Sequence, residues 1–513
     1  MSAETTVGGI TTDERVHPEA SAADTPTRAE TLNASVIAEL RAIVGDDGVI
    51  SSYEQRRAYE SDGLPSFHVT PALVVLPTTT AQVQGVMRVC HRERIPVVPR
   101  GSGTGLSGGA LPSRGSVVVA LSRMRSILDV DLVNQRAVVQ PGVINLWITQ
   151  RIAPDGYYYA PDPSSQQVCS IGGNVAENSG GAHCLKYGFT VNHVLGMTVV
   201  LPDGELIEVG APTLDAPGYD LTGVFVGSEG TLGLATEITL RLMRKAQTVE
   251  TLLAAFDHTD ACGEAVSRII SSGIVPAAVE IMDRLAIEAA EKAVHANYPD
   301  ASALLLVEVD GPLAEVTYQH ERVEAICREL GATELRWART DEERALMWKG
   351  RKAAFAAVGR ISPDYLVQDG VIPRTALSEV LREIEALSAA CGLRVANVFH
   401  AGDGNLHPLV LFDQREPDAE RLAEQLAGDI LRACVAHGGS ITGEHGVGFD
   451  KKDFMPLMFS EADLATHQLV RCAFDPEYLC NPDKVYPTPR LCGETPGKYE
   501  RHPVEIAGLG ERF

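Results

Sequence analysis

Short runs of β-branched residues alternate with turns between about residues 70 and 245. Apolar runs bounded by Gly, Pro and Asp are typical of buried strands. One segment, residues 81–95, instead repeats its apolar positions with helical spacing, and so do residues 35–45, where Gly45 can end a helix. This part of the chain is therefore predicted to be mixed α/β. We expect strands within residues 72–77, 95–100, 116–121, 136–142, 196–205 and 235–242.

The pattern changes near residue 246, from where longer helical segments separate the strands. Strand-like residues 250–256 and 303–310 alternate with segments of helical spacing. Runs of this kind suggest an α+β domain built on an antiparallel sheet. We expect its first helices within residues 261–273, 284–294 and 315–330.

Residues 379–392 predict a long helix, which leads into two strands around the turn Gly402-Asp-Gly-Asn405. The rest of the chain is predicted to be helical and then irregular. A chain of 513 residues exceeds the size of a single hydrophobic core, so two or more domains are expected. We predict an α+β protein with a disordered lead-in at residues 1–32, a first domain at 33–245, a second domain at 246–487 and an irregular tail at 488–513.

The composition is acidic, with a formal net charge of −24. Such a surface repels phosphate backbones, which argues against nucleic-acid binding, and an anionic substrate would need a locally positive pocket. The N-terminus lacks the basic and apolar parts of a signal peptide, and no run approaches the roughly 18 apolar residues of a membrane span. We expect a cytoplasmic protein, with peripheral attachment to the inner membrane through a partner as an alternative.

The ten cysteines include no CxxC pair. An iron–sulfur cluster or a disulfide framework needs regular spacing. We therefore interpret the cysteines as buried, reduced thiols, and we expect no cluster within this chain.

The densest glycine cluster is PRGSGTGLSGG, residues 99–109. Gly103, Gly105 and Gly108 satisfy the pattern GxGxxG, but a Rossmann dinucleotide site needs a helix directly after such a loop. Pro112 interrupts that helix and a strand follows, so the Rossmann interpretation is rejected. Two interpretations remain: a loop whose backbone N–H groups bind phosphate oxygens, and a glycine-rich surface turn.

Two further glycine clusters favour the first interpretation. They are SIGGNVAENSGG, residues 170–181, and GSEGTLG, residues 227–233, each beside a predicted strand. The three motifs in this order resemble the FAD-binding domain of oxidases of the vanillyl-alcohol oxidase/PCMH type. The resemblance covers nearly the whole chain from about residue 40. It implies an FAD-binding domain of two subdomains, followed by an FAD-linked oxidase C-terminal substrate (cap) domain.

The resemblance also implies which residues bind FAD. Members with covalently bound flavin carry a histidine in the first loop, where this chain has Thr104, so we expect non-covalent FAD. The matching residues are Arg100, Gly101, Ser102, Gly103, Thr104 and Gly105 around the pyrophosphate, Gly172, Gly173, Asn174, Asn178, Gly180 and Gly181 along the flavin, and Glu229, Gly230 and Ile238 beside the rest of the cofactor.

A second candidate site combines histidines with a carboxylate. His400 and His407 flank the Gly402–Asn405 turn, and Glu444 and His445 stand between two glycines. A histidine taken alone more often has a structural role. Two imidazoles and one carboxylate, however, leave open positions on a divalent metal for a substrate. The group as a whole therefore favours a metal site.

Within this family, the resemblance to the 2-hydroxyacid dehydrogenases gives these residues roles. It implies a divalent metal on His400, His407 and Glu444, with His445 as the catalytic base and Arg351 as the group that binds the substrate carboxylate. Zn²⁺ is the first expectation for this ligand set, with Fe²⁺ and Mn²⁺ as alternatives. The D-2-hydroxyglutarate dehydrogenases of the family have an asparagine where this chain has Leu409. We therefore expect a compact acid of two or three carbons.

The leading hypothesis is an FAD-dependent 2-hydroxyacid dehydrogenase or oxidase. It would oxidise glycolate or D-lactate to the 2-oxo acid, with hydride transfer to flavin N5 and metal-assisted formation of the alkoxide. The alternatives are an FAD-linked sugar or alcohol oxidase of the same fold and a flavin electron-relay subunit of a larger complex. The acceptor is left open among an iron–sulfur subunit, a quinone and a soluble carrier. A homo-oligomer and a multi-subunit complex are likewise both retained.

Overall fold

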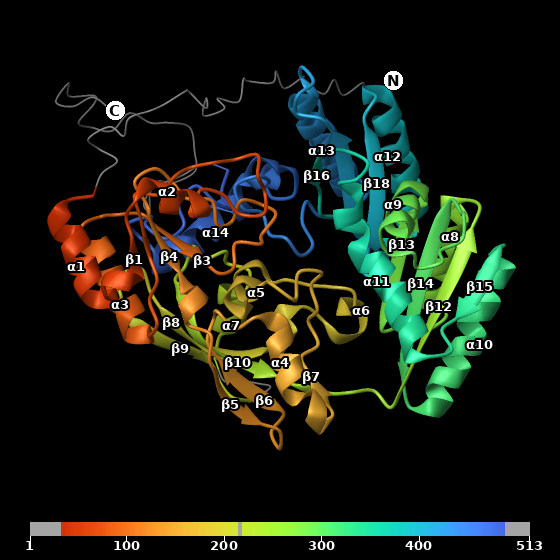
Figure 1. Ribbon diagram of the computed structural model, residues 1–513, viewed down its shortest axis with the longest axis horizontal. Coiled ribbons are helices and arrows are strands. Elements are labelled where there is room, and N and C mark those ends of the chain that lie inside the picture. Colours follow the sequence, from red (N-terminus) through yellow and green to blue (C-terminus); the bar gives the residue numbers. More distant parts are fainter. Residues whose placement is uncertain (1–31, 214–217, 488–513) are drawn as a thin grey trace, which may run out of the picture.

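The computed structural model describes residues 32–213 and 218–487, which form two halves joined near residue 245 (Figure 1). The first half contains the red to yellow segments together with the blue α14 near the end of the described chain, and the second half contains the green and teal segments and the blue α13. The predicted lead-in, apart from Leu32, and the predicted tail lie outside the described residues.

The first half contains two sheets, listed here in their spatial order. The smaller has β1 (Val49–Ile50), β2 (Leu73–Val75), β4 (Val117–Ala120) and β3 (Val97–Arg100), and the larger has β5 (Ile127–Asp131), β6 (Arg136–Val139), β10 (Leu234–Arg241), β8 (Val194–Val200) and β9 (Leu206–Gly210). Strands β2, β4 and β3 run parallel, and β1 is antiparallel to β2. The larger sheet is antiparallel throughout. Strands β7 (Tyr157–Tyr158) and β11 (Met243–Arg244) form a separate two-stranded ribbon.

The helices of this half cover both sheets. They are α1 (Ala34–Val44), α2 (Tyr53–Arg56), α3 (Thr80–Arg92), α4 (Asn145–Ile152), α5 (Ile171–Glu177), α6 (Cys184–Tyr187) and α7 (Leu221–Phe225). Apolar residues of α1 and α3 share one core with the smaller sheet, and those of α4 and α5 share another with the larger sheet. Helix α1 begins after Asn33, whose side chain accepts a hydrogen bond from Ser35 N, and ends at Gly45 with φ +86°, as predicted.

The second half is built on one antiparallel sheet of eight strands. In spatial order they are β15 (Glu334–Trp337), β12 (Thr248–Phe256), β14 (Ala303–Gly311), β13 (Ala278–Asp283), β18 (Arg394–His400), β19 (Asn405–Phe412) and β16 (Asp364–Val367), and β17 (Gly370–Val371) also pairs with β19. Strands β18 and β19 form the predicted hairpin.

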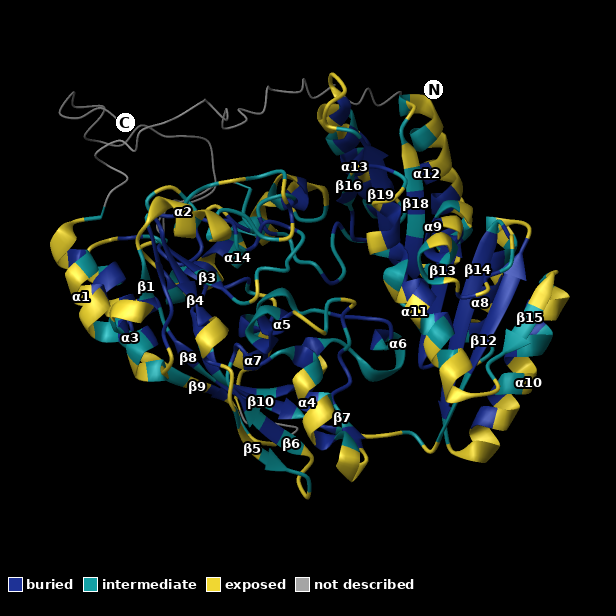
Figure 2. Ribbon diagram, in the orientation of Figure 1, coloured by how far each residue is buried: buried dark blue, intermediate teal, exposed yellow. Residues whose placement is uncertain are grey.

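Helices cover both faces of this sheet, and Figure 2 shows its strands mostly buried between them. The helices are α8 (Thr259–Ser271), α9 (Arg284–Val294), α10 (Leu313–Glu329), α11 (Asp341–Val358), α12 (Leu377–Cys391) and α13 (Ala419–Ala436). Residues of α8, α10, α12 and α13 share one core cluster with the strands, and those of α9 and α11 share the other. Apolar side chains alternate between the two faces of a strand, so both faces can be buried in this way.

The C-terminal segment returns to the first half. After α14 (Glu461–Phe474), Val97 N donates to the carbonyl of Leu479 at 2.8 Å, and Asn481 N donates to the carbonyl of Val97 at 2.7 Å. The Asn481 side chain donates to the carbonyls of Gly109 and Glu229. The end of the described chain therefore supports two of the three glycine loops.

The α+β fold class and the main strands and helices predicted from the sequence are confirmed. The loop after β3 leads into β4 without a helix, which agrees with the rejection of a Rossmann site. Eight cysteines of the described residues are free thiols. Cys472 is disulfide-bonded, so the prediction of reduced thiols throughout is wrong at that position. None of the described helices is long and apolar enough to span a bilayer.

Candidate functional site

A cavity of about 920 Å³ lies between the two halves. Its wall in the first half contains all six predicted residues of the loop at 100–105, together with Gly172, Gly173, Asn174, Glu229 and Gly230. Its wall in the second half contains Lys352, Phe355, Glu444 and His445. One cavity therefore joins the glycine loops to the Glu444–His445 motif, although the two lie far apart in the sequence.

The glycines of the second loop allow a close approach of backbone segments. Gly172 and Gly173 lie in α5, which the sequence did not predict because glycine lowers helix propensity. A Cβ at Gly172 would lie 2.6 Å from the Cβ of Pro141, so the helix can pack there only with glycine. A Cβ at Gly173 would meet only the Ser170 hydroxyl, at 3.5 Å, so glycine there leaves the cavity wall free of a side chain.

Four of the predicted cofactor residues do not line this cavity. Asn178 ends α5 in the left-handed region, and its Oδ1 accepts a hydrogen bond from Val191 N at 2.9 Å. Gly180 and Gly181 lie just beyond, and a Cβ at Gly180 would lie 2.8 Å from Oε2 of Glu444. Ile238 is fully buried in β10. The cofactor roles of these four residues stay predictions.

The β18–β19 hairpin brings the two predicted metal-binding histidines together. His400 ends β18, His407 lies in β19, and their ring centroids are 5.0 Å apart. Gly404 in the turn has φ +77°, a conformation that favours glycine. The Nε2 atoms of His400 and His407 lie 3.3 and 3.0 Å from Oε1 of Glu444. The hairpin thus directs both imidazoles at one buried carboxylate.

A second carboxylate lies behind His400. Glu280 is opposite His400 in the register of β13 and β18, and its Oε1 is 2.7 Å from His400 Nδ1. Its Oε2 is 2.5 Å from Nη2 of Arg351, and all three side chains are at least 97% buried. When a carboxylate accepts a hydrogen bond from Nδ1–H of a histidine, the lone pair of Nε2 is left for a metal, as in many metal sites. Arg351 therefore pairs with Glu280, and its Nε has no hydrogen-bond partner.

His445 faces the cavity beside His407. The two rings are stacked, with centroids 5.0 Å apart and planes inclined by 14°. Nε2 of His445 is 3.8 Å from Oε1 of Glu444. Burial lowers the pKa of His445 to about 4, so the imidazole is neutral at neutral pH and can accept a proton.

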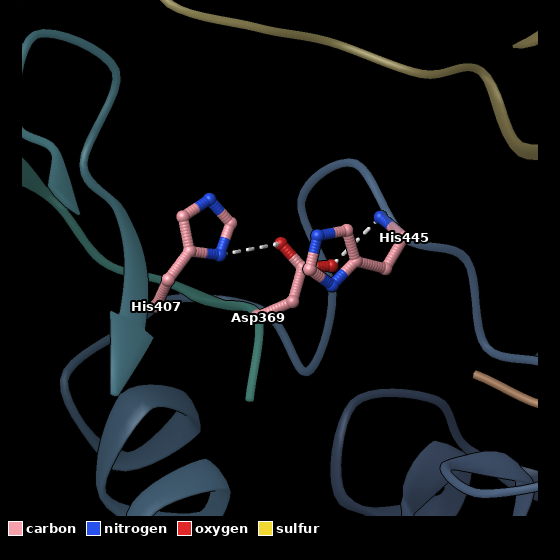
Figure 3. Close-up of side chains that lie close together, drawn as sticks. All are labelled: Asp369, His407 and His445. Carbon is pink, nitrogen blue, oxygen red and sulfur yellow. Dashed lines mark hydrogen bonds and ion pairs between the residues drawn. The ribbon is translucent and has the colours of Figure 1, made fainter. Parts of the chain in front are cut away.

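Among the described residues, two groups of side chains have a geometry that could hold a metal ion. One is His400, His407 and Glu444, and the other is Asp369, His407 and His445, shown in Figure 3. In the first group, His400 Nε2 and Glu444 Oε2 are buried without a hydrogen-bond partner. In the second group, Nδ1 of His407 and Nδ1 of His445 also have no hydrogen-bond partner, but Asp369 already accepts several hydrogen bonds from protein donors. The first group therefore fits a divalent metal better.

The charges of the first group agree with this choice. Burial alone would raise the pKa of Glu444, but His400 and His407 outweigh burial and hold that pKa well below its usual value. Burial alone would lower the pKa of His400, but Glu280 and Glu444 raise it well above its usual value. Two buried carboxylates thus attract positive charge to the imidazole between them.

Further carboxylates border the cavity near the third glycine loop. Glu229 accepts from the N–H groups of Val447 and Gly448 at 2.6 and 2.8 Å, and burial raises its pKa to about 7. Burial, followed by the charge of Glu229, raises the pKa of Glu177 well above its usual value. Both carboxyl groups line the cavity.

Sequence reasoning missed three acidic residues of this region. Glu177 lies within the second glycine motif, and Asp369 follows β16. Glu280 is a charged residue between the apolar residues Val279 and Ile281 of β13, which is the signal that could have revealed it. Leu409, taken as a substrate position, is instead fully buried in a core cluster, whereas Phe355 lines the cavity.

Comparisons with known proteins agree with this architecture. Residues 71–210 match the FAD binding domain family, and residues 245–485 match the family "FAD linked oxidases, C-terminal domain". Glycolate oxidase subunit GlcD of Escherichia coli is 51% identical over 469 residues, which cover 91% of this chain and 94% of that protein. D-lactate dehydrogenase of Anaerostipes hadrus is 31% identical over 460 residues, 88% of this chain and 95% of that protein.

A solved structure of p-cresol methylhydroxylase with bound substrate has the same fold, with a TM-score of 0.75 and 18% identity. The similarity covers 88% of this chain and 96% of that one. The likeness in fold and the two sequence relatives lead to one assignment. The chain belongs to the FAD-linked oxidase family that includes glycolate oxidase subunit GlcD and D-lactate dehydrogenase.

Proposed function

We propose that this protein oxidises a short 2-hydroxy acid, glycolate or D-lactate, to the 2-oxo acid, with FAD bound in the cavity. The observation that carries the proposal is the single cavity with glycine loops on one wall and Glu444 and His445 on the other. The names of the relatives, a glycolate oxidase subunit and a D-lactate dehydrogenase, support the substrate class.

The glycine loops would hold FAD without a covalent bond. Residues 100–105 offer backbone N–H groups, and Gly173 leaves the wall clear of a side chain. Thr104 borders the cavity where covalent members of the family have histidine. Bound FAD would supply the hydride acceptor.

His400, His407 and Glu444 would hold a divalent metal, with Zn²⁺ favoured over Fe²⁺ and Mn²⁺ for this ligand set. Buried ligand atoms without hydrogen-bond partners support this. A metal in this position would supply Lewis-acid chemistry to the substrate hydroxyl.

The protein's own groups complete the proposed site. His445, neutral and facing the cavity, would take the proton of the substrate hydroxyl. Lys352 lines the cavity and brings positive charge to a chain of net charge −24, which an anionic substrate needs. Arg351, expected from the sequence to bind the substrate carboxylate, instead pairs with Glu280, so its role in substrate binding stays a prediction. Phe355 lines the cavity with its ring centroid 5.8 Å from that of His407, where it would limit the room for a longer acid.

Anaerobic mixing with single 2-hydroxy acids tests the proposal, because reduced flavin loses its yellow absorbance. We expect glycolate or D-lactate to bleach the flavin, and D-2-hydroxyglutarate to do so much less well. A flavoprotein that stays oxidised with every short 2-hydroxy acid would contradict the proposal and support an electron-relay subunit. Bleaching by sugars or simple alcohols alone would support the sugar or alcohol oxidase.

The His445→Ala variant tests the role of the base. It is expected to keep FAD and to lose flavin reduction by roughly 100-fold or more, the range of general base catalysis. His437→Ala is the matched control, because His437 pairs with Glu383 on the surface of the second half. Normal flavin reduction in His445→Ala would exclude His445 as the base.

A further inference from the structure

Asp369 lies between β16 and β17, and its side chain has no exposed surface. Three successive backbone N–H groups point at its carboxylate. Oδ2 accepts from Gly443 N and His445 N, each at 2.9 Å, and from Glu444 N at 3.2 Å. One buried anion therefore binds the backbone of both Glu444 and His445.

Two side chains complete the surroundings of this carboxylate. The Thr442 hydroxyl donates to Oδ2 at 2.6 Å, and Lys451 Nζ lies 3.3 Å from the same atom. Lys451 is 99% buried, so the two charges are held together away from water. Burial alone would raise the pKa of Asp369, but Lys451 and the neighbouring histidines hold it well below its usual value.

The other oxygen of Asp369 faces a predicted metal ligand. Oδ1 lies 3.9 Å from Nδ1 of His407 (Figure 3). Nε2 of the same ring lies 3.0 Å from Oε1 of Glu444. A negative charge beside Nδ1 favours the tautomer with its proton on Nδ1, which leaves the Nε2 lone pair for a metal. Glu280 has the same relation to His400, with a direct hydrogen bond. Each of the two imidazoles thus has one carboxylate behind it.

We propose that Asp369 is a positioning residue that fixes Glu444, His445 and the tautomer of His407 as one unit. This inference rests on the proposed metal at His400, His407 and Glu444. In this proposal Asp369 lies behind the ligands: three N–H groups, one hydroxyl and one ammonium surround Oδ2, and Oδ1 lies 3.3 Å from Glu444 N and 3.9 Å from Nδ1 of His407. It acts through the loop backbone and through His407.

The Asp369→Asn variant tests this role in the FAD-loaded protein. Asparagine keeps the size of the side chain but loses the charge and one acceptor, so some N–H groups lose their partner. We expect Mn²⁺ or Zn²⁺ to bind about 10- to 100-fold more weakly, the usual effect of removing a group behind a metal ligand. FAD content should be unchanged, and kcat should fall while KM changes little.

Asp475→Asn is the matched control. Asp475 is also fully buried, pairs with Arg471 at 3.3 Å and accepts from Leu479 N and Cys480 N, but in the C-terminal turn. It should lower the unfolding midpoint as Asp369→Asn does, yet leave metal affinity unchanged. Equal metal affinity in wild type and Asp369→Asn would overturn the inference.

Thr442→Val and Thr442→Ser give a second test if Asp369→Asn fails to fold. Valine removes one donor to Asp369 and should weaken metal binding several-fold, whereas serine keeps the hydroxyl and should restore it. Equal affinity for valine and serine variants would contradict the inference. If Asp369→Asn binds no Mn²⁺ or Zn²⁺ while Glu444→Gln binds the metal normally, Asp369 is a metal ligand and Glu444 is not, which would contradict the inference. If the wild type binds no divalent metal, both this inference and the proposed metal site fall.

Discussion

Replacing Glu280 by glutamine should weaken both the fold and the metal site. Glu280 is 99% buried and pairs with Arg351 at 2.5 Å and with His400 at 2.7 Å. Glutamine has nearly the same size and can still offer an oxygen to one of the two partners. It cannot balance the charge of Arg351, which then remains buried without its partner.

The size of the effect follows from these contacts. Removal of one partner of a buried ion pair costs about 3–5 kcal/mol, because the other charge stays desolvated. His400 would face a neutral amide instead of a carboxylate, which makes its Nε2 a weaker ligand. Loss of such a partner behind a ligand lowers metal affinity by about 10- to 100-fold.

Denaturant unfolding and Mn²⁺ titration of the FAD-loaded protein measure the two effects. Glu39→Gln is the control, because Glu39 pairs with Arg92 at 2.6 Å with both side chains about half exposed. Exposed pairs contribute little, so that variant should resemble the wild type. The reasoning is refuted if Glu280→Gln unfolds at the same denaturant concentration as the wild type and binds Mn²⁺ equally well.

Three other predictions concern the turn, the interface between the halves and the substrate. Gly404→Ala should destabilise the protein far more than Gly392→Ala. Both glycines have φ near +75°, but only at Gly404 would a Cβ overlap a backbone carbonyl, that of Ile372. Denaturant unfolding of the two variants measures the difference in stability. Burial alone would lower the pKa of His183, but two neighbouring carboxylates raise it from 6.5 to about 10. The stability advantage of wild type over His183→Gln should therefore be full below pH 6.5 and fade as the pH rises toward 10, and an undiminished advantage at pH 10 would contradict this. Lys352→Met should raise KM for glycolate or D-lactate about five-fold and leave kcat nearly unchanged in steady-state assays. The five-fold change corresponds to the loss of about 1 kcal/mol of substrate binding energy from one partly exposed charge. An unchanged KM would exclude Lys352 from substrate binding.

The sequence predicted those parts of the fold that depend on local patterns. The β18–β19 hairpin follows from two apolar runs around a Gly-Asp-Gly-Asn turn, and α1 from its periodicity and Gly45. Helix α5 was missed, because its packing against Pro141 outweighs the low helix propensity of two glycines.

Partners that are distant in the sequence could not be predicted. Glu280 and His400 are 120 residues apart, and only the register of β13 with β18 places them opposite each other. Asp369 likewise meets the loop at 443–445 through hydrogen bonds that no local motif encodes. The sequence therefore indicated the residues of the proposed metal site, whereas the carboxylates behind them became visible only in the fold.

The central claim is that a divalent metal held by His400, His407 and Glu444 and FAD in the cavity lined by Glu444 and His445 act on the same 2-hydroxy acid. The most direct test is anaerobic stopped-flow reduction of the flavin by glycolate or D-lactate, in chelator-treated protein to which Mn²⁺ or Zn²⁺ is returned in steps. We predict that the rate is very low without metal and rises in proportion to bound metal up to one ion per chain, and that His407→Ala does not recover. Full-speed flavin reduction in the metal-free protein would contradict the account.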